Sequence, residues 1–121
     1  MVKYIDLQNK VCVELNNEHG SELYEICYAD SYDLSNSHWH NDSLFVHASE
    51  FMQLTPHLNH VFHHFHYYGA QLIRVNEWNH VKEVYASSDS SSDEFDYFFR
   101  CVDSWLRHKR NDADYFWILG V

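Results

Sequence analysis

The stretch from Thr55 to Gly69, T-P-H-L-N-H-V-F-H-H-F-H-Y-Y-G, predicts the helix around which the rest of the chain is arranged. Thr55 is a candidate N-cap, Pro56 takes the first helical position, and Gly69 is a candidate C-terminal stop. Apolar residues recur at helical spacing and would face the core: Leu58, Val61, Phe62, Phe65 and Tyr68. Five histidines fill the remaining arc: His57, His60, His63, His64 and His66. The purpose of this histidine-rich outer face is the functional question that the pattern raises.

Short segments rich in β-branched and aromatic residues predict strands on both sides of this helix. These segments are residues 2–7, 11–15, 44–46, 70–75 and 115–119, of which 70–75 is expected to be a central strand. Residues 22–28 alternate well enough for a further strand, with a helix beginning at Ser21 as the alternative. Ser49 is a candidate cap for a short helical turn before Thr55.

Two further helices are predicted after residue 75. Asn76 can cap a helix that continues to Tyr85, with a hairpin return strand as the alternative. Ser91 and Glu94 have capping-box spacing at the start of the second helix. Its apolar face is formed by Phe95, Phe98, Phe99, Val102, Trp105 and Leu106. The order of elements predicts an α+β fold, a mostly antiparallel sheet with helices packed on one face, and a single domain over residues 1–121.

Charge is the strongest compositional signal. Eight Lys and Arg against eighteen Asp and Glu give a net charge of −10. Lys10 and Arg74 are consecutive basic residues, so the span between them contains only acidic charges: Glu14, Glu18, Glu22, Glu25, Asp30, Asp33, Asp42 and Glu50. A one-signed span projects a negative field, which disfavours direct binding to nucleic acid or to an anionic membrane. The alternative is a solvated acidic face that aids solubility.

The chain has no apolar run near the ~18 residues that span a bilayer, and its N-terminus lacks the apolar stretch of a signal peptide. Three scattered cysteines, Cys12, Cys27 and Cys101, are typical of buried thiols in a reducing compartment and not of a disulfide framework. We therefore expect a cytoplasmic protein.

Metal binding and catalysis are weakly indicated. His57, His60 and His64 form the best candidate metal set, but no cysteine lies near them and the H-E-x-x-H signature is absent. Three glycines leave no phosphate-binding loop, and no nucleophile has a marked partner. An acid–base pair of histidines stays an alternative, although a nuclease would also need cations for its substrate's phosphates. We expect a protein that is not an enzyme and has no cofactor.

Recognition of a basic protein is the function that the acidic span favours. Its aromatic residues alternate with carboxylates, and Asp30–Ser43 has the composition of a long loop. Aromatic anchors supply burial at an interface, while carboxylates steer a basic partner. The alternative is that half of the aromatics are core. The predicted contact residues are Glu22, Tyr24, Glu25, Asp30, Tyr32, Asp33, Trp39 and Asp42.

This small, acidic, aromatic-rich chain without a catalytic motif resembles bacterial immunity proteins, including those of contact-dependent growth inhibition and of the nuclease-colicin and barstar types. The resemblance is one of overall character, carried by the span from Glu14 to Glu50. It implies a protein that binds a cognate toxin domain, often a nuclease, and blocks its active site with carboxylates that face the toxin's Lys and Arg. Two alternatives remain, a phage-encoded nucleic-acid mimic such as an anti-CRISPR protein and a histidine-rich metal-binding protein.

Overall fold

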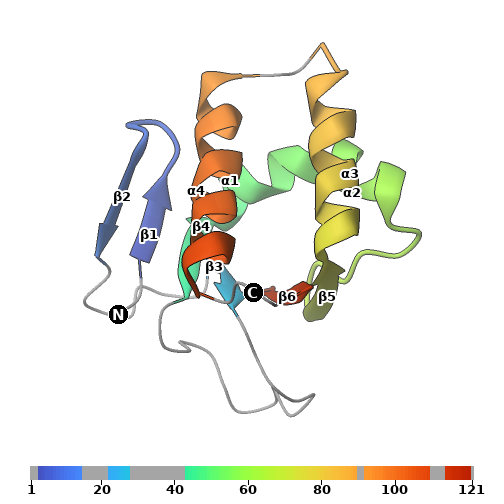
Figure 1. Cartoon of the computed structure of the whole chain (residues 1–121), viewed down its shortest axis with the longest axis horizontal. Helices are drawn as coiled ribbons and strands as arrows, with labels where there is room; N and C mark the ends of the chain where they lie inside the picture. The colour runs from blue at the N-terminus through green and yellow to red at the C-terminus, as the bar shows by residue number, and fades with distance from the viewer. Residues whose placement is uncertain (1–2, 15–21, 28–42, 90–91, 110–113, 121) are drawn as a thin grey trace.

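The computed structural model describes residues 3–14, 22–27, 43–89, 92–109 and 114–120 of the chain. Six strands form one sheet in the order β2-β1-β4-β3-β6-β5 (Figure 1). The strands are β1 (Lys3–Asp6), β2 (Val11–Glu14), β3 (Leu23–Cys27), β4 (Leu44–His47), β5 (Ala70–Arg74) and β6 (Tyr115–Leu119). Among these strands β1 and β4 run parallel, and every other neighbouring pair is antiparallel. The predicted α+β fold with a mostly antiparallel sheet is confirmed.

The helices are α1 (Ala48–Phe51), the 3-10 helix η1 (Met52–Leu54), α2 (Thr55–Val61), α3 (Val75–Ala86) and α4 (Asp93–Lys109). They pack on one face of the sheet, because alternate strand residues such as Ile26 and Ile118 belong to the same core cluster as the helix side chains. Their neighbours Cys27 and Trp117 point to the opposite face and pack in a separate, smaller cluster. None of the described helices combines the length and apolar character that crossing a bilayer requires.

Of the predicted strand 22–28, residues 23–27 form β3 and not the alternative helix, and Tyr28 lies outside the described residues. Strand β3 lies inside the sheet between β4 and β6, and four of its five residues are buried. The expectation that residues 70–75 form a central strand is wrong, because β5 pairs with β6 alone at the edge of the sheet. Only Ile73 of β5 is buried. A strand at the edge of a sheet can be stable with few buried residues, and the burial pattern of β5 agrees with an edge position.

The predicted helix from Thr55 to Gly69 is correct in its first half only. Helix α2 ends at Val61, because Phe62 adopts an extended backbone with φ −107° and ψ 128°. Thr55 is not the cap, since its hydroxyl donates to the Met52 carbonyl oxygen at 2.6 Å. Phe62 and Phe65 are each 8 % exposed, although they lie in the non-helical chain that follows α2. Tyr68, which was expected to face the core, is 83 % exposed.

Helices α3 and α4 agree with the predicted apolar faces, with different caps. Arg74 caps α3 in place of the predicted Asn76, which lies inside the helix, and the Arg74 backbone N–H donates to the Glu77 side chain at 2.9 Å. Ser92 caps α4, since its hydroxyl oxygen accepts the Phe95 N–H at 3.3 Å. The predicted cap Ser91 lies outside the described residues.

An ion pair also joins the two helices. Lys82 of α3 and Asp103 of α4 lie 2.8 Å apart. Both side chains are partly buried, so this pair fixes one helix against the other.

Aromatic rings dominate the core between the sheet and the helices. Trp78 is fully buried, with ring centroids 5.3 Å from Phe99 and 5.5 Å from Phe116. Tyr24 is 1 % exposed and donates its hydroxyl to the Tyr67 carbonyl oxygen at 2.9 Å. Each such side chain contributes roughly 1.5–3 kcal/mol or more through burial, so the aromatic content of the chain is largely structural.

Candidate functional site

Of the predicted partner contacts, three lie in the described part of the chain. Glu22 is exposed, and its carboxylate lies 3.5 Å from His47 Nε2. Tyr24 and Glu25 are each 1 % exposed, and Glu25 accepts a hydrogen bond from the Ser43 hydroxyl at 2.7 Å. Their prediction as contacts is wrong, because β3 is buried on both faces. The other predicted contacts lie outside the described residues: Asp30, Tyr32, Asp33, Trp39 and Asp42.

The alternative metal set is not brought together. His57 is 6 % exposed and packs edge-on against Tyr85, with ring centroids 5.6 Å apart. His60 is exposed on α2, and His64 follows the end of that helix. Within the described ranges, no group of three or more His, Cys, Asp or Glu side chains could hold a metal ion. The early end of α2 is the reason, since it removes the helical spacing on which this set depended.

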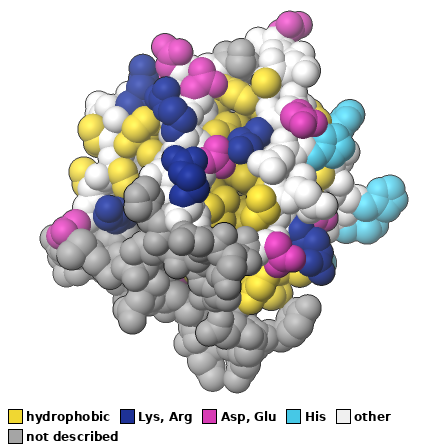
Figure 2. Space-filling model, in the orientation of Figure 1, with side chains coloured by type: hydrophobic (Ala, Val, Ile, Leu, Met, Phe, Trp, Pro, Cys, Tyr) yellow, Lys and Arg dark blue, Asp and Glu magenta, His cyan; other side chains and the backbone are white. Residues whose placement is uncertain are grey.

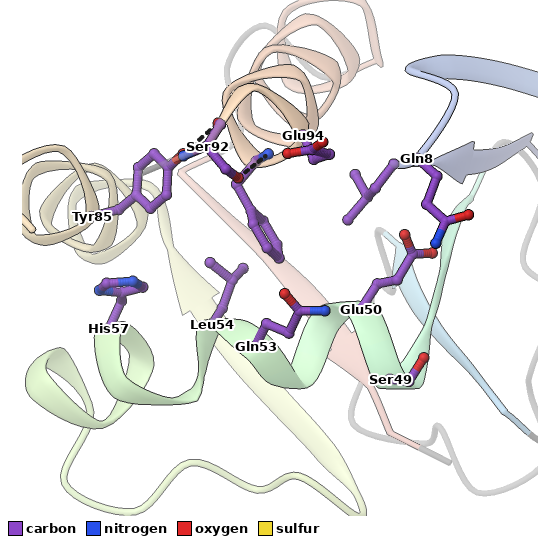
Figure 3. A pocket seen from close by; sticks show the side chains of 11 residues that line it. Gln8, Ser49, Glu50, Gln53, Leu54, His57, Tyr85, Ser92 and Glu94 are labelled. Atoms are coloured by element: carbon purple, nitrogen blue, oxygen red, sulfur yellow. Dashed lines mark hydrogen bonds between the residues drawn. The ribbon is translucent and has the colours of Figure 1, made fainter. Parts of the chain in front are cut away.

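The structure instead forms a pocket that the sequence did not indicate. The pocket has a volume of about 460 Å³ and lies between the β1–β2 turn, α1 with η1, and the ends of α3 and α4 that face each other (Figure 3). Its polar lining comes from Gln8, Ser49, Glu50, Gln53, Ser92 and Glu94. Its apolar and aromatic lining comes from Leu7, Leu54, His57, Tyr85 and Phe95. This volume suits a small ligand or one long side chain of a partner.

Two local hydrogen-bond networks hold the walls of the pocket. His47 Nδ1 accepts the backbone N–H of Ser49 at 3.2 Å and so caps α1, which carries Glu50 in its first turn. On the opposite wall, the Tyr85 hydroxyl oxygen accepts the Ser92 N–H at 2.6 Å and donates to the Ser92 carbonyl oxygen at 2.7 Å. This double contact attaches the start of α4 to the end of α3.

The serine hydroxyls of the pocket have structural roles. Ser49 Oγ lies 2.8 Å from His47 Nδ1, a contact that resembles an activated nucleophile. The same ring nitrogen accepts the Ser49 N–H, however, which is how a helix cap binds. Ser92 Oγ accepts the Phe95 N–H and caps α4. The geometry of both serines is therefore explained by helix capping.

The pocket is acidic. Burial raises the pKa of Glu50, and the neighbouring Asp6 carboxylate raises it further. Glu94 adds a second carboxylate, and none of the described residues that line the pocket is Lys or Arg. Figure 3 shows the Glu50 and Gln8 side chains pointing toward one another across the opening between α1 and the β1–β2 turn. Burial also lowers the pKa of His57, so its ring is held neutral.

Other charges near the pocket do not make its surroundings positive. The N-terminal end of α4 lies beside the pocket, and its macrodipole is equivalent to a positive charge of about half an elementary charge. Three carboxylates in the first turn outweigh it: Asp93, Glu94 and Asp96. Lys10 of the β1–β2 turn lies 3.8 Å from the Asp93 carboxylate. On the face shown in Figure 2, Lys and Arg side chains likewise lie among Asp and Glu. The pocket is therefore suited to a positively charged group.

Comparisons of this chain with protein families, curated proteins and solved structures found no match.

Proposed function

We propose that this protein is a non-catalytic inhibitor that captures a basic protein partner and takes one of the partner's Lys or Arg side chains into the pocket. The observation that carries the proposal is a pocket with two carboxylates, Glu50 and Glu94, and no Lys or Arg among the lining residues that the structure describes. A net charge of −10 supports it, because it attracts a basic protein over a distance before contact.

The state of Glu50 favours a cationic ligand. Its raised pKa means that the carboxylate lacks solvation or a counter-charge that it would have in water. A guanidinium or ammonium group supplies that counter-charge, and two unit charges about 4 Å apart attract by about 4 kcal/mol at an effective dielectric constant of about 20. The amides of Gln8 and Gln53 offer carbonyl oxygens to the remaining N–H groups of the same ligand.

A toxin domain is the partner that fits the proposal best. A nuclease toxin binds phosphates with Lys and Arg, and carboxylates that occupy those side chains block its substrate site. The resemblance to bacterial immunity proteins implies this mode of action, and a cytoplasmic location agrees with three free thiols. A phage-encoded nucleic-acid mimic would capture a nucleic-acid-binding effector by the same chemistry, so the identity of the partner separates the two.

The experiment that tests the proposal is capture from cells of the source organism at low and high salt, with three forms of the immobilised protein. They are the wild type, the double variant Glu50→Gln/Glu94→Gln, and the control Glu83→Gln/Asp89→Asn. The control removes the same charge from exposed positions outside the pocket. We expect one basic protein to be retained by the wild type and the control and lost from the pocket variant. Equal retention by all three forms would refute the role of the pocket.

A further inference from the structure

Two cysteines that are far apart in the sequence meet at the edge of the sheet. Cys12 is exposed on β2, and its cross-strand partner on β1 is Ile5. Directly opposed residues of neighbouring strands project to the same face, and Ile5 is fully buried beneath the helices. Cys12 therefore points to the side of the sheet that α4 covers. Cys101 lies on α4 and packs against the same core cluster, and the two thiols are hydrogen bonded to each other.

The surroundings of the pair give the two sulfur atoms different roles. Cys101 Sγ accepts hydrogen bonds from the Cys12 thiol and the Tyr97 hydroxyl, and the Arg100 guanidinium adds positive charge nearby. These contacts lower the pKa of Cys101, while the hydrogen bond between the two thiols raises the pKa of Cys12. Cys101 is therefore the sulfur of the pair that ionises more readily. A thiolate is the nucleophilic form of cysteine.

The third cysteine has the opposite character. Cys27 is fully buried in the cluster on the far face of the sheet. Burial, with Glu25 nearby, raises the pKa of Cys27 to about 12. It therefore serves as an internal control for an unreactive thiol.

We propose that Cys12 and Cys101 form a reactive dithiol that a peroxide oxidises to a disulfide between β2 and α4. Cys101 Sγ attacks one oxygen of hydrogen peroxide, the O–O bond breaks, and hydroxide leaves, so Cys101 becomes a sulfenic acid. Cys12 Sγ then attacks Cys101 Sγ, the S–O bond breaks, and water leaves with the Cys12 proton. In total, two thiols are oxidised to one disulfide and one peroxide is reduced to two waters. This proposal is independent of the partner and of the pocket.

The disulfide has a mechanical consequence for the fold. It joins the β1–β2 hairpin at one edge of the sheet to the long helix beside it (Figure 1). A cross-link between segments so distant in sequence removes much of the freedom of the unfolded chain. Oxidation is therefore expected to raise Tm by several degrees.

The test is titration of the reduced full-length protein with hydrogen peroxide, followed by intact mass and peptide mapping without reduction. We expect a loss of two hydrogen atoms per chain, a linked pair of peptides that contain Cys12 and Cys101, and an unmodified Cys27. The variant Cys27→Ser should form the same disulfide at the same rate. A disulfide that includes Cys27, or linkage only between separate chains, would overturn the proposal.

Three variants separate the roles of the two sulfurs. Cys12→Ser should stop at the sulfenic acid, which a dimedone probe traps on Cys101. Cys101→Ser should oxidise more slowly than the wild type and form no disulfide, because it lacks the sulfur whose pKa is lowered. Tyr97→Phe should move the pH profile of Cys101 alkylation to higher pH. Equal peroxide rates for wild type and Cys101→Ser would contradict the assignment of Cys101 as the attacking thiolate.

Discussion

Gly120 packs its α-carbon directly against the backbone of Tyr67, where a β-carbon on residue 120 would overlap the Tyr67 carbonyl group. The contact is reinforced on both sides. The Gly120 N–H donates to the Gly69 carbonyl oxygen at 2.8 Å, and the Tyr67 carbonyl oxygen accepts the Tyr24 hydroxyl at 2.9 Å. The end of β6, the segment after α2 and the first half of β3 therefore meet around the Tyr67 carbonyl group.

The variant Gly120→Ala should lose about 1–3 kcal/mol of unfolding free energy or more, since the added methyl group can be accommodated only by moving backbone. Gly69→Ala is the matched control. Nothing lies within 4 Å of a β-carbon at that position, and its backbone is not left-handed. Urea denaturation of both variants measures the difference, and equal losses would contradict the close approach at Gly120.

Replacing Glu50 with Gln should increase stability at neutral pH. The pKa of Glu50 is raised in the folded protein by burial and by Asp6, so its ionised form destabilises the fold above that pKa. The glutamine is neutral at every pH, and we expect a gain on the order of 0.5 kcal/mol at pH 7. The gain should vanish below about pH 4, where the carboxyl is protonated in both states. Thermal unfolding at several pH values checks the sign.

His57 should make the fold sensitive to mild acid. Burial lowers its pKa in the folded state, so the stability that the neutral ring contributes is present above about pH 6.5 and is lost as pH falls through the folded pKa. His57→Gln removes this titration and should flatten the fall in Tm below about pH 6.5. His60→Gln, on the exposed side of the same helix, should leave the fall unchanged. Identical pH profiles for the two variants would contradict this role of His57.

Trp78 should tolerate phenylalanine far better than alanine. Its ring is fully buried, and no hydrogen-bond partner for Nε1 lies in the described part of the chain. Trp78→Ala should cost about 3–5 kcal/mol of unfolding free energy. Trp78→Phe keeps a ring between Phe99 and Phe116. It also removes a buried N–H whose desolvation costs about 1–3 kcal/mol, so this variant should lose less than about 2 kcal/mol of unfolding free energy. Chemical denaturation compares the two.

Partner binding should weaken between about pH 7.5 and pH 5.5, because an unperturbed histidine has a pKa of about 6.5. Burial lowers the pKa of His57, so the other ten histidines carry the effect, and their protonation would change the net charge from −10 to about 0, the sum of −10 and 10. Capture of the partner at the two pH values measures the effect. A constant affinity over this range would argue against an interface driven by charge.

Secondary structure was predictable wherever periodicity extended over a long segment. The apolar spacing from Phe95 to Leu106 is sustained over several turns, and α4 follows it. Helix α2 shows the limit of this reasoning. Phe62 and Phe65 continue the helical spacing, yet their rings also reach the core from extended chain, so the pattern could not locate the end of the helix.

The two sites discussed above carried no signal in the sequence. Gln8, Glu50 and Glu94 come from three separate elements, and no motif relates them. Cys12 and Cys101 were predicted to be buried thiols outside any disulfide framework. Cys12 is instead exposed, and the pairing of β1 with β2 under α4 brings it to Cys101. Conversely, the acidic and aromatic spacing of β3 indicated an exposed interface that burial on both faces rules out for Tyr24 and Glu25.

The sequence by itself determined the class of fold, the apolar faces of the long helices and the negative charge of the molecule. These properties depend on residue type and on spacing along the chain. Tertiary structure alone decided which strand lies at the edge, which carboxylates and histidines are buried, and which distant side chains share a pocket or a thiol contact. Those outcomes depend on which faces of the elements meet, and local propensity holds no information about distances between segments far apart in the chain.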